Sequence, residues 1–270
     1  METEYDAWRD HYEVRRLRRA LVQAIPDLTE RFPSHRLYGE APIEKILGPY
    51  QTRAGKVEAR TLASMVFLNR GDHFEGARLP REAQWSAAFT PVVADFDGDG
   101  NEDVFLSQNF AASQPEVSRL DAGRGLMLRG DGTGKFQAVD GSQTGILVYG
   151  DQRGAAAADY DADGRVDLVV AQNGAETHLL HNQTARPGLR VRLSGPPGNP
   201  SGVGAVVRLK SGGQWGPARE IHGGSGSGSQ DDTVQVLGSS QSPEAVQVRW
   251  PGGAITETVV GDQKEIVIRR

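Results

Sequence analysis

The spacing of hydrophobic residues divides the chain into a helical beginning and a longer β-rich remainder. Apolar side chains at residues 5–28 recur mostly at three- and four-residue steps, which predicts an amphipathic helix. The stretch "APIEKILG" at 41–48 predicts a second, short helix with a proline near its start and Gly48 at its end. After about residue 56, short runs of Val, Leu and Phe alternate with Gly and Asp turns, as in a multi-stranded sheet protein. We expect strands, and no further helices, from there onward.

The β-rich part contains an internal repeat with a period of 64 residues. "ADFDGDGNEDVFLSQN" at 94–109 and "ADYDADGRVDLVVAQN" at 158–173 are identical at eight of sixteen positions, including four aspartates, where chance gives about one. A second element follows each copy, at 125–139 and at 177–183, and "SMVFLNRGDHFEGARL" at 64–79 resembles it without an acidic loop before it. The repeating unit is a strand, an acidic loop, a strand and a hairpin, which suits a four-stranded propeller blade.

A proline- and glycine-rich stretch at 185–188 marks a further boundary. The strands expected beyond it show period-two alternation, and "RWPGGAITETVV" predicts a hairpin that turns at 251–253. These strands cover 189–194, 203–210, 233–237, 245–250 and 264–269. We expect them to form a small β-sandwich of roughly 80 residues. The predicted fold is therefore mainly β, with a helical segment or propeller insertion at 1–60, partial calcium-binding β-propeller blades at 61–186 and a C-terminal β-sandwich at 187–270.

Composition and motifs exclude several classes of function. A net charge of −5 argues against a nucleic-acid-binding protein, and the absence of cysteine excludes disulfides and thiolate metal sites. No segment approaches the ~20 apolar residues of a membrane span, and the N-terminus does not have the pattern of a signal peptide. The G-x-S-x-G, H-E-x-x-H and Rossmann patterns are all missing. We therefore predict a binding protein without catalytic residues.

Each acidic loop places oxygen donors at alternate positions, which suits a hard divalent cation. With Asp95 or Asp159 as position 1, the side chains at positions 1, 3 and 5 can converge on one point, and the backbone carbonyl at position 7 can join them. Gly100 permits the bend in the first loop. Six to eight oxygens at about 2.3–2.6 Å suit Ca²⁺ better than Mg²⁺ or Zn²⁺. Because four carboxylates in one loop repel one another, we expect the ion to hold the loop closed. The predicted ligands of two Ca²⁺ sites are Asp95, Asp97, Asp99, Asn101 and Asp103, and Asp159, Asp161, Asp163, Arg165 and Asp167.

An EF-hand and a solvated turn are the two other interpretations of an aspartate-rich loop. An EF-hand needs a bidentate Glu at position 12 followed by a helix, but position 12 is Leu106 or Val170 inside a β-type run. The EF-hand therefore fails in both copies. A solvated turn rich in aspartate remains the alternative, because turns favour aspartate in any case.

The residues also resemble a known family. "DFDGDGNEDVF" and "DYDADGRVDLVV" look like the FG-GAP or VCBS repeats of integrin-type β-propellers, whose calcium loops have the form D-x-D-x-D-G-x-x-D. "GVGAVVRL", "REIHGGSGSGSQ" and "VQVRWPGG" together resemble the ASPIC/UnbV domain that follows such repeats in bacterial exported proteins. A propeller normally has 4 to 8 blades. We therefore expect a partial propeller, a piece of a longer chain, or one part of an oligomer.

The resemblance implies a calcium-dependent, non-catalytic interaction or adhesion protein that binds a protein or glycan ligand. It also implies an extracellular, periplasmic or cell-surface location. Two alternatives remain: a hydrolase of extracellular polymers with a catalytic metal at the aspartate loops, and a glycan-binding module that uses exposed tryptophans.

Other residues have less specific interpretations. Trp85, Trp215 and Trp250 could form a sugar-stacking platform, although partly buried anchors are the commoner role of tryptophan in β proteins. His178 and His181 form an H-x-x-H pair, but on a strand these positions point to opposite faces, which favours a surface or stacking role over zinc.

Two further segments have alternative interpretations. "GGSGSGSQ" at 223–230 favours a flexible loop of the sandwich over a phosphate-binding loop, because no lysine follows it. "RRLRR" at 15–19 favours a solvated face, with binding of an acidic partner as the alternative.

Overall fold

The computed structural model describes residues 3–111, 119–226 and 228–270, and it divides them into two compact units. One unit contains the described residues up to Leu62, and the other contains those from Ala63 onward. Most described residues in regular structure belong to strands, so the predicted mainly-β class is confirmed. No helix of the described residues is long and apolar enough to cross a membrane.

The first unit is a short hairpin followed by short helices, so the predicted continuous helix at 5–28 is wrong. The side chain of Asp6 accepts a hydrogen bond from the backbone N–H of Trp8 at 2.8 Å, and Asp10 takes a left-handed φ of 53°, which turns the chain back on itself. Leu21 and Leu28 are buried as their spacing predicts, but they come from two helices that share one core. The elements are β1 (Thr3–Asp6), β2 (His11–Val14), α1 (Arg18–Val22), α2 (Leu28–Arg31), α3 (His35–Gly39), α4 (Ile43–Leu47) and the 3₁₀ helix η1 (Gly48–Arg53). Helix α4 confirms the helix predicted at 41–48.

The second unit begins with three antiparallel sheets. The first is the hairpin β3 (Met65–Asn69) and β4 (Phe74–Arg78); the second, the four-stranded sheet, has the order β5 (Ala88–Ala94), β6 (Asp103–Gln108), β7 (Leu126–Gly130) and β8 (Phe136–Val139). The third, the three-stranded sheet, has the order β9 (Gln152–Ala158), β10 (Asp167–Gln172) and β11 (His178–Leu180). Two one-turn helices, η2 (Arg81–Gln84) and α5 (Gly141–Thr144), interrupt a region in which we expected none.

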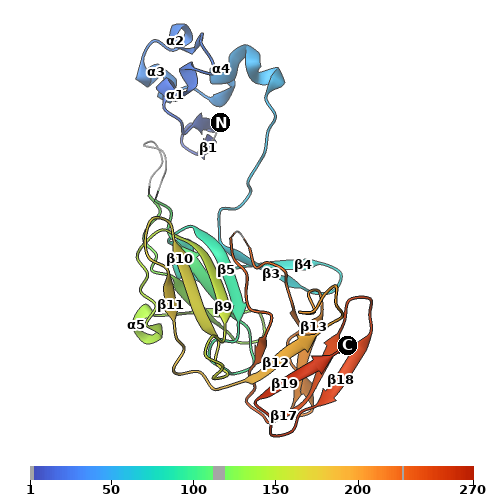
Figure 1. Cartoon of the computed structure of the whole chain (residues 1–270). Coiled ribbons are helices and arrows are strands. Elements are labelled where there is room, and N and C mark those ends of the chain that lie inside the picture. The colour runs from blue at the N-terminus through green and yellow to red at the C-terminus, as the bar shows by residue number, and fades with distance from the viewer. Residues whose placement is uncertain (1–2, 112–118, 227) are drawn as a thin grey trace. The chain divides into compact units, whose positions relative to one another are not determined.

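The four-stranded and three-stranded sheets share one hydrophobic core, with β5 beside β9 (Figure 1). Phe105 of β6 is fully buried in this core, and Ala155 and Ala157 of β9 belong to the same cluster. Close packing of this core thus combines one large ring with the small side chains of β9. Each sheet contains one copy of the 64-residue repeat, as predicted, although the second copy lacks the fourth strand of the predicted unit among the described residues. The sheets in the described part of the chain do not form a closed propeller.

The C-terminal strands form two further sheets around a core that contains the fully buried Trp250. One sheet places β12 (Leu189–Ser194) between β16 (Gln235–Leu237) and β19 (Glu265–Arg269), and β12 and β19 run parallel. The other contains β13 (Val206–Ser211), β14 (Gln214–Trp215), β15 (Arg219–Glu220), β17 (Pro243–Arg249) and β18 (Ile255–Val259). Arg249 pairs with Ile255 across β17 and β18, which confirms the hairpin predicted at 251–253.

The stretch at 185–188, expected as a boundary, is bonded to both acidic loops. The backbone N–H of Arg186 donates to the carbonyl of Asp97 at 3.2 Å, and that of Gly188 donates to the carbonyl of Gly164 at 2.7 Å. Farther along the chain, Gly238 lies so close to the first loop that a Cβ atom on it would overlap the Oδ2 atom of Asp95. These contacts join the loops directly to the C-terminal sheets.

We expect Gly238→Ala to destabilise the protein by about 1–3 kcal/mol, because the added methyl group must displace a buried carboxylate and its backbone neighbours. Urea unfolding measures the change. Gly261→Ala is the matched control, since a Cβ atom there meets nothing within 4 Å. Equal stability of the two variants would contradict the close approach of Gly238 to the loop.

Candidate functional site

The two acidic loops, residues 95–103 and 159–167, share most of their internal backbone-to-carboxylate hydrogen bonds. In the first acidic loop, Oδ1 of Asp95 accepts from the N–H of Asp99 at 3.1 Å, and Oδ2 accepts from the N–H of Gly100 at 2.9 Å. In the second, Asp159 makes the equivalent bonds to Asp163 at 3.0 Å and Gly164 at 2.9 Å. The sequence repeat is therefore also a repeat of local structure.

Both loops bend through left-handed backbone conformations. Gly98 and Gly100 have φ values of 74° and 96° in the first loop. In the second, Gly164 has a φ of 84°, and Ala162 takes the place of Gly98 with a φ of 64°. Left-handed φ is uncommon for a residue with a side chain, so the rest of the second loop must hold Ala162 there.

The aspartate at position 9 joins each loop to its sheet. Asp103 accepts from the N–H of Phe96 with one carboxylate oxygen and from the N–H of Gly130 with the other, both at 2.9 Å. Asp167 accepts in the same way from Tyr160 at 3.2 Å and from Asn182 at 2.7 Å. Asp103 thus ties the second residue of its loop to the last residue of β7, and Asp167 ties the second residue of its loop to a residue just after β11.

Asn182 connects the two loops, a role that sequence reasoning missed. Its side-chain amide donates to the carbonyl of Phe96 at 2.8 Å and to the carbonyl of Val166 at 3.0 Å. Phe96 belongs to the first loop and Val166 to the second, so one side chain bridges them. A contact across 86 residues leaves no local pattern in the sequence.

Arginine side chains partly balance the charge of the loops, and a histidine lies beside the second loop. Arg129 lies 2.8 Å from Asp97 in the first loop, and in the second Arg165 lies 2.5 Å from Asp163. The second loop also contacts the buried guanidinium of Arg190, 3.2 Å from Asp159, and the imidazole of His181, 3.1 Å from Asp161. In the first loop Arg219 also lies 2.6 Å from Glu102, so each loop has two arginine partners among the described residues.

Burial works against the charged form of several loop aspartates. It raises the pKa of Asp103 to about 7, against the opposing effect of the hydrogen bonds from Gly130 and Phe96. Burial also raises the pKa of Asp95 and of Asp167 above the usual range. Buried carboxylates of this kind are stabilised by a nearby cation.

The carboxylate oxygens converge as ligands of one ion must. Two ligands of the same Ca²⁺ at about 2.3–2.6 Å lie at most about 5 Å apart. One ligand atom from each member of three sets, a carboxylate oxygen or the ring nitrogen of histidine, falls within 4.8 Å of the others: Asp95, Asp97 and Asp99; Asp159, Asp161 and Asp167; and Asp161, Asp163 and His181. The oxygen-rich donor set of each loop fits a hard cation such as Ca²⁺.

The remaining predicted ligands lie beside these sets. Asp103 is not part of the converging set in the first loop. The side chain of Asn101 donates to Asp99 at 3.2 Å, and the backbone N–H of Arg165 donates to Asp163 at 2.8 Å. The roles predicted for the carbonyls of Asn101 and Arg165 stay predictions.

The other candidate residues do not form a second centre. His181 contacts the second loop and packs edge-on against the ring of Tyr160 at 5.6 Å, whereas His178 is not part of any converging set among the described residues. Trp250 is 1% exposed and its indole N–H donates to Thr256 at 2.9 Å, so it is a core residue. A sugar platform that includes Trp250 is therefore excluded.

The segment at 223–230, expected as a flexible loop, is bonded to the edge of β9. The hydroxyl of Ser229 accepts from the N–H of Ala155 at 3.1 Å, and Asp231, just after the segment, accepts from the N–H of Ala157 at 2.7 Å. The backbone N–H of Asp232 then donates to the carbonyl of Ala157 at 2.9 Å. These bonds satisfy an edge that would otherwise be open to strand pairing.

Comparison with known proteins supports the identity of the C-terminal sheets. Residues 195–266 match the family described as ASPIC and UnbV. This match covers less than a third of the chain and contains neither acidic loop. The comparison with curated proteins gives no match.

The raised pKa of Asp103 predicts how the calcium-free protein responds to pH. Between about pH 4 and pH 7 the folded state binds a proton on Asp103 that the unfolded chain has lost, so this group stabilises the fold more as the pH falls. We expect Asp103→Asn to reduce the gain in melting temperature between pH 8 and pH 5.5 in the presence of a chelator. If the melting temperatures of the two proteins changed equally with pH across this range, the raised pKa of Asp103 would be contradicted.

Proposed function

We propose that this chain is a calcium-binding interaction module in which Ca²⁺ at the two acidic loops fixes the four-stranded sheet, the three-stranded sheet and the C-terminal sheets as one body. The observation that carries the proposal is the convergence of three carboxylate oxygens within 4.8 Å in each loop. The loops lie where the sheets meet, so an ion bound there acts on several elements at once. The role is structural and non-catalytic.

The contacts of the loops support this role. Asn182 bridges the two loops, and the segment at 185–188 bonds to both of them. Calcium would add a counter-charge to carboxylates that Arg129 and Arg165 balance only in part. A calcium-loaded loop would therefore hold its neighbours more firmly than the hydrogen bonds alone.

The propeller relationship and the location belong to the same proposal. The strand–loop–strand repeat supports blades of the FG-GAP or VCBS type, and the C-terminal match supports an ASPIC/UnbV domain after them. A protein or glycan ligand outside the cell or at its surface agrees with the millimolar calcium that weak sites require.

Calcium is expected to raise the melting temperature of the protein. At a free calcium concentration about 100 times the Kd, each site contributes about 2.7 kcal/mol, which corresponds to about 5–10 °C for a unit of this size. Scanning calorimetry with calcium and with chelator measures the shift. An unchanged midpoint, together with no bound calcium by elemental analysis, would refute the proposal.

Substitution of one carboxylate in each loop separates specific binding from a general effect of salt. In Asp97→Asn combined with Asp161→Asn, each new side chain retains an oxygen that can accept the same loop N–H, at 3.2 Å in both loops. We expect this variant to fold and to lose most of the calcium-induced shift. Asp262→Asn, outside both loops, is the control and should keep the full shift; an equal loss in both proteins would argue against the loops as the site.

A further inference from the structure

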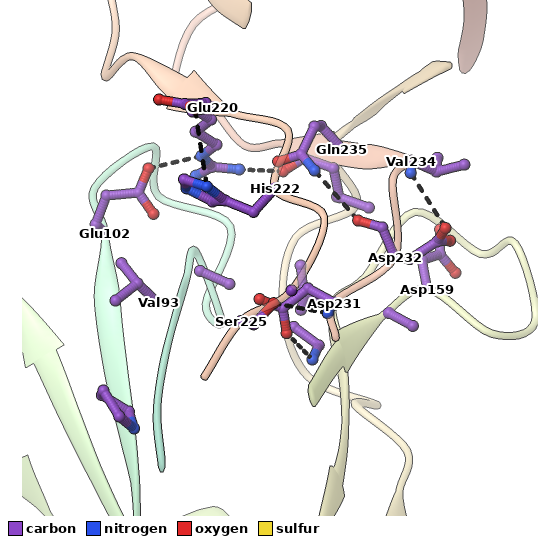
Figure 2. A pocket seen from close by; sticks show the side chains of 18 of the residues that line it. Val93, Glu102, Asp159, Glu220, His222, Ser225, Asp231, Asp232, Val234 and Gln235 are labelled. Atoms are coloured by element: carbon purple, nitrogen blue, oxygen red, sulfur yellow. Dashed lines mark hydrogen bonds and ion pairs between the residues drawn. The ribbon is translucent and has the colours of Figure 1, made fainter. Parts of the chain in front are cut away.

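A cavity of about 470 Å³ lies at the acidic-loop ends of β5 and β9 (Figure 2). Residues from the C-terminal part of the chain close its other side. One wall comes from the sheets and includes Val93, Glu102 and Val166. The opposite wall comes from residues 218–225 and 231–236. All of these residues belong to the same compact unit. The cavity shares only Asp159 with the converging carboxylate sets.

Five carboxylates line the cavity, and arginines neutralise two of them. Arg219 lies 2.6 Å from Glu102 and also donates to the carbonyl of Val236, which holds it against the wall. Arg190 lies 3.2 Å from Asp159, behind the lining. These two pairs leave Glu220, Asp231 and Asp232.

The remaining three carboxylates have no Arg or Lys within ion-pair distance in the described ranges. Asp231 accepts from the N–H of Ala157 at 2.7 Å, and Asp232 accepts from the N–H of Val234 at 3.2 Å. Glu220 is about half exposed, and its nearest basic neighbour is His222 at 3.9 Å. The cavity therefore has an excess of negative charge that the protein itself does not neutralise.

The spread of these carboxylates does not suit a metal ion. Glu220, Asp231 and Asp232 are absent from every set of three ligand atoms within 4.8 Å, unlike the aspartates of the acidic loops. Separated negative charges on a cavity wall match a larger, organic cation whose charge is spread over several N–H groups. An anionic ligand would instead meet uncompensated carboxylates.

Apolar side chains cover much of the remaining lining. Val166 and Val234 are buried, and Val93 is about half exposed. Such a wall favours the aliphatic part of a long basic side chain, which packs on apolar surface while its charged end reaches a polar partner. The cavity volume falls within the range of ordinary small-ligand pockets.

We propose that this cavity binds an arginine side chain presented by a partner protein, with its guanidinium directed at Glu220, Asp231 and Asp232 and its stem on the valines. Arginine suits the site better than lysine because a planar guanidinium offers five donors to separated acceptors. This inference deepens the proposed interaction function and rests on it, because it gives that function a ligand class.

Nuclear magnetic resonance titration of the ¹⁵N-labelled chain in saturating calcium tests the proposal. The probe is acetyl-Gly-Arg-Gly-amide, and the matched peptide carries citrulline, which has nearly the same shape but no charge. We expect the arginine peptide to shift the backbone amides of Gly224, Ser225 and Val234 and to bind at least tenfold more tightly than the citrulline peptide. No shift at these amides, or equal shifts with both peptides, would overturn the proposal.

Variants connect the binding to the named carboxylates. Glu220→Gln combined with Asp232→Asn removes two charges and keeps an oxygen that can accept from Val234; we expect about a tenfold loss of affinity for the arginine peptide. Glu257→Gln combined with Asp262→Asn removes the same charge elsewhere and should bind as the parent does. Equal binding by both variants would overturn the assignment.

The calcium-induced shift in melting temperature is measured on the same samples. A normal shift without arginine binding would refute this inference alone. Loss of the calcium shift would refute the proposed function itself.

Discussion

The second unit depends on keeping four buried carboxylates stable where its sheets meet. Asp95, Asp103, Asp159 and Asp167 are each at most 5% exposed. A buried carboxylate is costly unless hydrogen bonds or positive charges compensate it. Here backbone N–H groups supply the hydrogen bonds, and the bonds of Asp103 and Asp167 also fix where each loop joins its sheet. The same carboxylates thus carry a cost of burial and hold each loop on its sheet.

The path of the chain after the second loop follows from this arrangement. Asn182 and the segment at 185–188 use the carbonyls of both loops as acceptors, so the C-terminal sheets begin at a fixed place on the earlier ones. Gly238 completes the contact because only a residue without a side chain fits against Asp95. Arg190, at the start of the C-terminal sheets, brings a guanidinium to Asp159. The junction is therefore specific in shape and in charge.

The two proposed sites are neighbours at this junction. Asp159 belongs to the second acidic loop and also borders the 470 Å³ cavity. The loops collect oxygens within the span of one small ion, whereas Glu220, Asp231 and Asp232 do not converge in this way. The two proposed modes of cation recognition thus use the same surplus of acidic residues and differ in how closely the oxygens converge.

The sequence by itself determined most of the strands after residue 56, the repeat and the aspartates of the loops, because these depend on local alternation and on spacing within nine residues. It also determined the short helix at 43–47 and the hairpin that turns at 251–253. It failed at residues 5–28, where helical spacing of Leu21 and Leu28 came from two helices in one core. Only the tertiary structure decided that Asn182 bridges the loops and that Gly238 meets Asp95. It also placed residues 223–232 along the edge of β9. The shared cavity of Glu220, Asp231 and Asp232 likewise came from the tertiary structure alone. Each of these depends on contacts between residues far apart in the chain, and no local pattern of residue types encodes such contacts.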